Sequence, residues 1–498
     1  MRQEIFRMER VTYVEKGMTQ LEDFNLQIYR GEVMGVIPVN GHGLAAFLRL
    51  LQWNLPLEDG FVYYGGERIN SWKEAKRGHN RISIIQNQSC LVERMTVADN
   101  IFVIRQGFHQ EIIRTGLLRR QLEPFLRDIG IGISADSYVE KLSSFERVVV
   151  EILRAVVMGH RLIVLNEIST LVSEPELRKL YEIIRKYAAQ GISFLYISLH
   201  FEEILQICDR AAMLSYGRIQ KVFQESEMTP DALDYPENYN RLVRGHMNSR
   251  QDRRQEKDAA MELRNICSGS LKRLNIRIDK GECIVIQSMD YVVFQKLTGI
   301  LTGDVTPDDG AVFLEGRQIT LKDSREVAII SEQPTRSMIF PSMSYMDNLC
   351  FGLFRRIPKR WGEGRIKESV RREYGQALGE EVFSMQMEDL TEMQKYQLVY
   401  TRILLQRPKI VFCIQPFKGA DLPHRIQIWK LIEAFLEKEI AVVILAINLA
   451  DSMTLAERLL RIDGTGTLIE ISKEEFSMLS SATPWRHLYC DRQDGKDP

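Results

Sequence analysis

Apolar and polar positions in the first half of the chain follow a strand-then-helix order. Residues 31–37 form a glycine turn that leads into an apolar, β-branched run, and residues 44–51 carry apolar side chains at helical spacing. Residues 161–165 and 192–198 are apolar runs typical of buried strands, and residues 174–190 have the periodicity of an amphipathic helix. Buried strands that alternate with helices predict an α/β fold with a mainly parallel sheet.

Two further stretches have helical character. The sequence Ser143-Ser-Phe-Glu146 resembles a capping box and predicts a helix over 142–158. Residues 105–129 combine helical periodicity with mixed charges, which predicts an exposed helical subdomain beside the sheet.

The same pattern occurs a second time along the chain. Gly31-Glu32 matches Gly281-Glu282, and Asp99-Asn100 matches Asp347-Asn348, so that matched positions lie 248 to 250 residues apart. We therefore predict two homologous domains, a charge-dense linker between them and a short C-terminal tail. These four segments are residues 1–244, 245–260, 261–478 and 479–498.

Composition narrows the class of protein. The chain is 45% hydrophobic and 27% charged with a net charge of −1, which is ordinary for a globular protein and argues against nucleic-acid binding. Its seven cysteines are scattered without a C-x-x-C pair, which predicts free thiols in a reducing compartment and no metal site. No apolar run reaches the length of a membrane span, so we expect any membrane association to come through a partner.

The turn Asn40-Gly41-His42-Gly43 connects the first apolar run to its helix. Strand, glycine turn and helix form the geometry of a phosphate-binding loop, in which backbone N–H groups face an anion. The usual pattern, G-x-x-x-x-G-K-[ST], has Pro38, Leu44 and Ala45 at its first glycine, lysine and hydroxyl positions. Two interpretations stay open: the turn binds nucleotide weakly through its backbone and His42, or it is an ordinary exposed turn.

Three local patterns resemble one known family. They are Tyr196 to Arg210, Thr96 to Phe102 and Ile329 to Arg336, which resemble segments of the tandem ATP-binding subunit of ribose/galactose-type sugar importers. The resemblance extends over about residues 5–478 and places the chain near the ATP-binding cassette (ABC) superfamily. It implies two cassette domains, each a mixed sheet with a helical subdomain, and ATP with Mg²⁺ at two composite sites. It also implies membrane permease subunits as partners, a second ATP-binding subunit as a further candidate partner, and a place at the inner face of the cell membrane.

The family's functional positions can be transferred to this chain one by one. Glu167 occupies the position of the general base, and we interpret it as vestigial because its usual partners are replaced. The switch histidine is Leu199, and strand alternation predicts that His200 points to the opposite face. The cofactor-binding positions, most of them substituted, are Asn40, Gly41, His42, Gly43, Leu44, Ala45, Ala46, Asn87 and Asn166.

The second half departs further from the family pattern. Counted from Gly281, its phosphate loop spans 288–295 with Phe294 at the lysine position, and its acidic pair is Ile414-Gln415. The glycines of the family's signature motif are also replaced by residues with side chains in both halves. The replacing residues are Phe145 in the first half and Glu392 and Met393 in the second. We expect four apolar replacements to fill the nucleotide cleft and hold the domains together: Leu44, Phe145, Phe294 and Met393.

These substitutions predict a degenerate, non-hydrolysing cassette subunit. It would act as a docking or regulatory component with a membrane permease, through its helical subdomains and the loops at Asn87 and Gln333. ATP and Mg²⁺ would bind weakly or not at all. Two alternatives stay open: an active, ATP-hydrolysing carbohydrate importer subunit, and a soluble interaction or signalling protein on the same scaffold. Two smaller expectations are that Tyr13 packs in the core instead of stacking on adenine, and that Lys395 and Arg402 lie on a solvated helix face.

Overall fold

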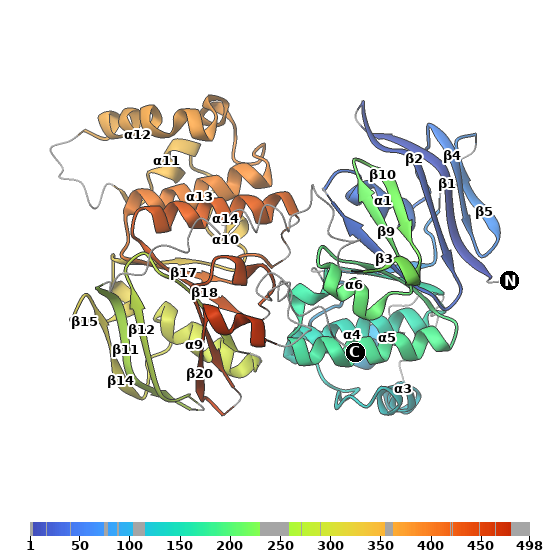
Figure 1. The fold of residues 1–498 in the computed structure, drawn as a ribbon, viewed down its shortest axis with the longest axis horizontal. Coiled ribbons are helices and arrows are strands. Elements are labelled where there is room, and N and C mark those ends of the chain that lie inside the picture. Colours follow the sequence, from blue (N-terminus) through green and yellow to red (C-terminus); the bar gives the residue numbers. More distant parts are fainter. Residues whose placement is uncertain are drawn as a thin grey trace. The chain divides into compact units, whose positions relative to one another are not determined.

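A computed structural model provides the coordinates of the chain, which divides into two compact units, Met1–Val243 and Arg244–Pro498 (Figure 1). We call them unit 1 and unit 2 and describe each by itself. The described residues are 3–15, 17–39, 41–73, 78–86, 89–102, 115–229, 258–269, 271–288, 290–353, 362–418, 420, 422–447, 449–463 and 465–479.

Unit 1 is built on a six-stranded sheet in the order β10-β9-β3-β8-β7-β6. All neighbouring strands in it run parallel except β9 and β10, which are antiparallel, so the sheet is mixed. The strands are β3 (Val33–Pro38), β6 (Ile82–Ile85), β7 (Leu162–Asn166), β8 (Ser193–Ile197), β9 (Arg210–Ser215) and β10 (Arg218–Phe223). A second, antiparallel sheet has the order β2-β1-β4-β5 and consists of β1 (Glu4–Glu15), β2 (Met18–Tyr29), β4 (Asp59–Tyr64) and β5 (Glu67–Ser71).

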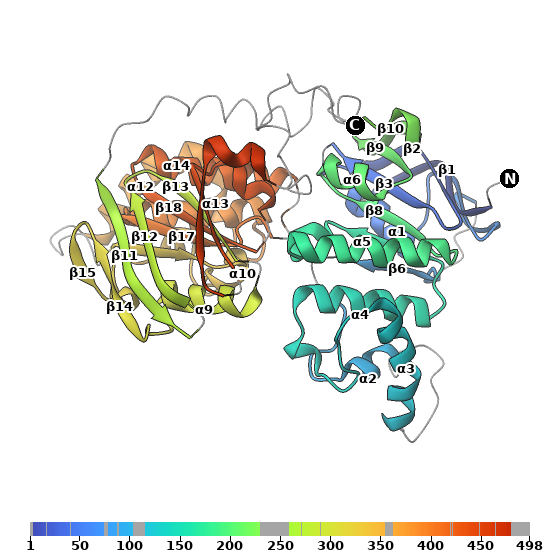
Figure 2. The same cartoon turned by 60° about the horizontal axis from the view of Figure 1, so that its bottom comes forward.

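The helices of unit 1 confirm the main sequence predictions. The predicted helices over 142–158 and 174–190 are α4 (Ser144–Val157) and α5 (Glu174–Ala189). Of the predicted helical stretch 105–129, α3 covers Thr115–Ile129, and residues 105–114 lie outside the described part of the chain. Figure 2 shows α2 and α3 beyond α4, away from the central sheet. The remaining helices are α1 (Leu44–Gln52), α2 (Val97–Phe102), α6 (Phe201–Ile207), η1 (Val139–Lys141), η2 (Ile168–Leu171) and η3 (Glu225–Glu227).

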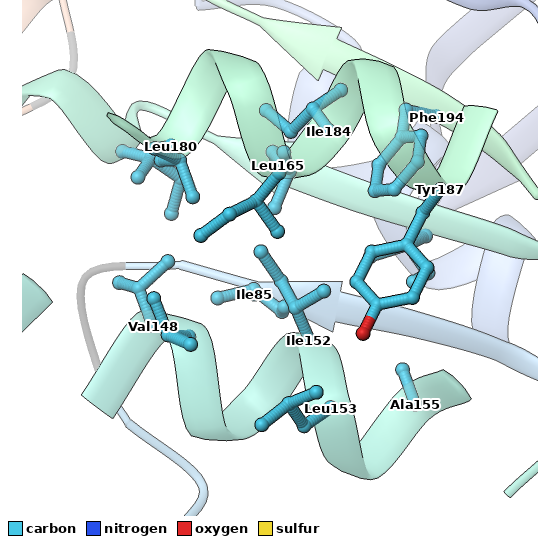
Figure 3. Close-up of a cluster of buried hydrophobic side chains, with 14 of the residues drawn as sticks. Ile85, Val148, Ile152, Leu153, Ala155, Leu165, Leu180, Ile184, Tyr187 and Phe194 are labelled. Atoms are coloured by element: carbon cyan, nitrogen blue, oxygen red, sulfur yellow. The ribbon is translucent and has the colours of Figure 1, made fainter. Parts of the chain in front are cut away.

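The largest apolar cluster of unit 1 joins α4 and α5 to the sheet (Figure 3). Side chains from one stripe of each helix meet strand residues from β6, β7 and β8, including Ile85, Leu165 and Phe194. All of them are buried, and burial of apolar surface is the main favourable term in folding. This packing fixes the start of α4, where Phe145 replaces a signature glycine, relative to the ends of the strands.

Unit 2 repeats this architecture. Its central sheet has the order β16-β17-β18-β13-β19-β20, which matches the order of unit 1 strand for strand. Its strands are β11 (Ala259–Ser268), β12 (Leu271–Asp279), β13 (Cys283–Ser288), β14 (Asp309–Leu314), β15 (Arg317–Ile319), β16 (Val327–Ile330), β17 (Ile410–Ile414), β18 (Ala441–Ala446), β19 (Arg458–Ile462) and β20 (Leu468–Ser472). Its helices are α9 (Tyr291–Thr302), α10 (Pro334–Ser337), α11 (Tyr345–Leu349), α12 (Glu363–Leu378), α13 (Glu392–Gln406), α14 (Leu422–Glu437), η4 (Leu321–Asp323), η6 (Glu380–Ser384), η7 (Ala450–Thr454) and η8 (Lys473–Met478).

The predicted fold class, two tandem α/β domains with mixed sheets and helical subdomains, is confirmed. Within the described residues, every helix is too short or too polar to cross a membrane.

Candidate functional site

The turn between β3 and α1 contains a glycine that close packing requires. Gly43 has a φ of 84°, and a Cβ there would lie 2.7 Å from the carbonyl oxygen of Gln20 and 2.8 Å from the Cα of Gly217. His42 is exposed, and its Nε2 donates to the carbonyl oxygen of Thr19 at 3.0 Å. The glycine is therefore explained by contacts with β2 and with the β9–β10 turn, without reference to a ligand. Asn40 lies outside the described residues.

The first turn of α1 offers backbone groups but little side-chain chemistry. Gly43 precedes the helix without a side-chain cap, so the first N–H groups of α1 keep the orientation that suits an anion. Leu44 is half-buried against the apolar core, Ala45 is exposed and Ala46 is buried. None of these side chains can donate a hydrogen bond to a phosphate or provide an oxygen ligand for Mg²⁺.

Glu167 and Asn166 lie at the carboxyl end of β7, as the sequence predicts. Glu167 has a φ of 55°, and its Oε1 accepts a hydrogen bond from the backbone N–H of Leu199 at 2.9 Å. The carboxylate at the general-base position is thus bonded to the backbone at the switch position. Asn166 is half-buried and provides a neutral amide where the family has an aspartate. Asn87 lies outside the described residues.

The argument from strand alternation for His200 is wrong. Strand β8 ends at Ile197, so Leu199 and His200 belong to the connection into α6 and do not alternate as strand residues do. His200 is 0% exposed and lies close to the buried carboxyl of Glu203. Leu199, at the switch position, is also buried, at 8% exposed.

A buried polar group beneath this region was not predicted from the sequence. The hydroxyl of Tyr196 donates to Oε2 of Glu203 at 2.7 Å, and the ring of Tyr181 lies edge-on to that of Tyr196. Burial raises the pKa of Glu203 above its ordinary value. The Glu-Glu sequence at 202–203 gave no indication of which carboxyl would be buried.

The predicted capping box at the start of α4 is confirmed. Oγ of Ser143 accepts from the N–H of Glu146 at 3.2 Å, and Oε2 of Glu146 accepts from the N–H of Ser143 at 2.8 Å. Unit 2 has the same arrangement at the start of α13, between Thr391 and Gln394. In both units these terminal N–H groups are bonded within their own capping box; in unit 1 one acceptor is a hydroxyl and the other a carboxylate.

The phosphate loop of unit 2 corrects the predicted alignment. Five residues (39–43) separate β3 from α1, whereas only two (289 and 290) separate β13 from α9. The loop is three residues shorter, so the residue that follows the N-cap in α9 is Tyr291, and Phe294 does not occupy the lysine position. Phe294 lies within α9, is 2% exposed and belongs to the core of unit 2.

Asp290 takes the place that an anion would take at the start of α9. Its Oδ1 accepts hydrogen bonds from the N–H groups of Val292 at 2.8 Å and Val293 at 3.0 Å. A carboxylate at a helix N-terminus is stabilised there by the helix dipole. The first turn of α9 is therefore capped by the chain itself.

A second internal contact lies at the carboxyl ends of β16 and β17. Nζ of Lys418 is 2.7 Å from Oε1 of Glu332, and Nε2 of Gln415 donates to Oε2 of the same carboxylate at 3.3 Å. Ile330 at the end of β16 pairs with Cys413 as Ile85 pairs with Leu165 in unit 1, so Glu332 occupies the place of Asn87. In unit 2, Ile414-Gln415 therefore stands where the family has its acidic pair. Glu332 stands where the family has its loop glutamine. Lys418 was not singled out from the sequence.

Comparison with known proteins finds relatives of similar sequence. The family model described as ABC transporter matches residues 21–170. A putative ribose/galactose/methyl galactoside import ATP-binding protein of Burkholderia cenocepacia is 24% identical over 470 residues, which cover 92% of this chain and 90% of that protein. A ribose import ATP-binding protein of Caldanaerobacter subterraneus is 23% identical over 486 residues, with 95% and 97% covered. The chain is a homologue of these import ATP-binding proteins.

The residues matched by the family model lie within unit 1, so the part of the chain that resembles an ABC transporter ATP-binding domain is in that unit. Among solved structures, a nucleotide-free ATP-binding cassette from an ABC transporter is 18% identical with a TM-score of 0.41, covering 47% of this chain and 96% of that one.

Other predictions about the cassette homologue have mixed outcomes. Tyr13 is buried in the core beside β2, in agreement with packing. The expectation of a solvated Arg402 is wrong: it is 4% exposed, and burial lowers its pKa to about 10. The hypothesis that apolar side chains fill the nucleotide cleft is also wrong for Phe145 and Phe294, because each belongs to the core of its own unit. It is not supported for Met393 either, whose side chain is 40% exposed.

Proposed function

We propose that this chain is a non-hydrolysing ABC cassette subunit that acts as a docking or regulatory component of a membrane permease. Its homologues are named as import ATP-binding proteins, and such a subunit would work at the inner face of the membrane through its partners. The permease would contact the helical subdomains and the loops at Asn87 and Gln333.

The capping of α9 by Asp290 carries this proposal. A triphosphate approaching the start of α9 would meet a carboxylate that already accepts the N–H groups of Val292 and Val293. Displacement of that cap costs about 1 kcal/mol and brings two anions together. The loop between β13 and α9 is also three residues shorter than the one between β3 and α1.

Three features of unit 1 support the same conclusion. Leu44 and Ala45 replace the phosphate-binding lysine and the Mg²⁺-binding hydroxyl, and Asn166 replaces an anionic ligand. A hydrogen bond to a charged group is worth about 1.5–3 kcal/mol. Because both units lack several such groups, hydrolysis would be negligible.

A second candidate function is weak nucleotide sensing by unit 1. The observation in its favour is the uncapped start of α1, where Gly43 leaves the first N–H groups oriented toward an anion. This candidate requires binding without turnover.

Titration with a fluorescent ATP analogue and Mg²⁺, alongside thermal unfolding, tests these functions. A ligand raises stability by RT ln(1 + [L]/Kd), so no shift at millimolar MgATP means negligible affinity for the folded protein. We expect no shift and no phosphate release, with an active import ATP-binding subunit as the positive control. A shift without turnover would favour the sensor, and turnover abolished by Glu167→Gln would overturn the proposal.

Copurification with a permease tests the docking part separately. Tagged chain purified in detergent from the membranes of its native cells should retain a membrane permease through the washes. A chain that consistently purifies without a permease would favour the soluble interaction protein.

A further inference from the structure

The segment that connects the sheet of unit 2 to its helical subdomain is held by a lysine. Residues 331–340, which we call the connecting segment, follow β16, contain α10 and lead toward α11 (Figure 1). Near its start, both oxygens of Glu332 are engaged: Oε1 by Lys418 at 2.7 Å and Oε2 by Gln415 at 3.3 Å. The Lys418 side chain is only 18% exposed, so solvent screens this ion pair less than an ordinary surface pair.

A second cation holds the other end of the connecting segment. Nη2 of Arg402, on α13, donates to the carbonyl oxygen of Met338 at 2.5 Å, and its guanidinium lies over the ring of Phe340. No carboxylate among the described residues forms an ion pair with this buried arginine. Its strongest contacts are therefore made to the connecting segment.

The connecting segment is also bonded to itself between these two points. Oγ of Ser337 donates to the carbonyl oxygen of Gln333 at 2.9 Å and lies 2.5 Å from Oγ of Ser331. One conformation is thus fixed at its start, its middle and its end.

Unit 1 holds the matching stretch with different residues. Arg154 donates to the carbonyl oxygen of Cys90 at 3.1 Å, as Arg402 does to that of Met338. The carboxylate of Glu151 accepts from Oγ of Ser89 at 2.5 Å and from the N–H of Cys90 at 2.9 Å. Unit 2 has the buried Val399 in place of Glu151, so it lacks this tether, and Lys418 supplies one from the turn that follows β17.

We propose that Lys418 and Arg402 form a clamp that keeps the connecting segment of unit 2 in one conformation without nucleotide. Lys418 is a positioning residue: its ammonium supplies, from within the chain, the positive charge that engages the loop carboxylate. The clamp itself does not depend on the proposed function. Only its purpose does, which is to present a preformed surface to the permease.

Hydrogen–deuterium exchange of the full chain tests the clamp. In the unmodified protein, peptides covering 331–340 should exchange slowly and be unaffected by millimolar MgATP. Lys418→Met and Glu332→Gln should each accelerate their exchange by roughly two- to fivefold, the range expected for an ion pair of this exposure. The double variant should be no faster than either single one, because both remove the same interaction.

Three controls separate positioning from general stability. Lys430→Met removes an exposed lysine of the same unit, on α14, and should leave the peptides unchanged. Lys418→Arg should restore slow exchange, and peptides of β18 should be unaffected in every variant. If Lys418→Met matched Lys430→Met, or if MgATP slowed the segment in the unmodified protein, the clamp would be refuted. ATP hydrolysis by the chain, in contrast, would overturn the proposed function and leave the clamp intact.

Discussion

Glu32 and Arg210 form a buried ion pair that joins the turn before β3 to the first residue of β9. Oε1 of Glu32 lies 2.5 Å from Nε of Arg210, and Oε2 lies 3.2 Å from Nη2. Unit 2 contains the same pair between Glu282 and Arg458, with Oε1 and Nε 2.6 Å apart. The internal repeat has therefore kept this ion pair in both units; it is buried in unit 1 and partly buried in unit 2, where the Arg458 side chain is 25% exposed.

Loss of Glu32 should strongly destabilise unit 1. Glu32→Ala leaves Arg210 buried without its carboxylate, which typically costs about 3–5 kcal/mol. Denaturant unfolding, monitored by hydrogen exchange of backbone amides in β3 and β13, should show a lower free energy of unfolding in β3 and no change in β13. Glu22→Ala, which removes the exposed partner of Arg218, should cost less than about 1 kcal/mol. Equal costs for the two variants would contradict the assignment of a buried pair.

The capping boxes should contribute measurable stability to helices α4 and α13. Ser143→Ala removes the side chain that accepts from Glu146 N–H and should cost about 1 kcal/mol in urea unfolding of unit 1. Thr391→Ala should have a similar effect on unit 2. Ser144→Ala, one residue into α4, is the matched control and should change stability little. A cost at Ser144 as large as that at Ser143 would contradict the cap.

Gly43 should be required for folding of unit 1 whether or not nucleotide binds. An alanine there must adopt a φ of 84° and place its Cβ against two backbone atoms, so we expect Gly43→Ala to cost more than about 2 kcal/mol. Gly65 has a φ of 62° with open space around it, so Gly65→Ala should show the conformational cost alone, about 1 kcal/mol. Thermal unfolding without nucleotide measures the difference. Identical losses would mean that packing does not select the glycine.

Burial of Glu151 should make unit 1 less stable as pH rises through the acidic range. Burial raises the pKa of this carboxyl, despite hydrogen bonds from Ser89 and Cys90 that act in the opposite direction. The folded state therefore binds the proton more tightly than the unfolded state. The stability contributed by this carboxyl should be greatest below the ordinary glutamate pKa and should fall until pH exceeds the raised value.

Comparison of two glutamine variants measures this contribution. Urea unfolding at a series of pH values should show a flatter profile for Glu151→Gln than for the unmodified protein. Glu140→Gln changes an exposed carboxyl near the same subdomain and should keep the original slope. An unchanged slope in Glu151→Gln would contradict the assignment.

The elements set by local pattern were predictable. The helix expected over 142–158 is α4, with the expected bonds between Ser143 and Glu146, and the strand–helix alternation gave the fold class. Helical periodicity and caps depend on residues three or four positions apart, so the sequence contains the whole interaction.

The candidate site was only partly predictable. Leu44 and Ala45 begin α1 and Glu167 follows β7, whereas Phe294 lies inside α9, because the loop before α9 is shorter than the one before α1. Residue counting from Gly281 cannot show where a strand stops and a helix starts. Asp290, which the alignment passed over, became the cap of α9 for this reason.

By itself, the sequence determined the duplication, the α/β class and the substitutions at the family positions. The tertiary structure alone decided what the replacing residues do: that Arg402 is buried, that Glu203 rather than Glu202 bonds to Tyr196, and that Lys418 reaches Glu332. These contacts join residues on different elements, in some cases far apart in the chain. The order of the strands in the sheet sets the distances between these residues, and the packing around each side chain sets its exposed fraction. Neither quantity is contained in the local pattern of residues.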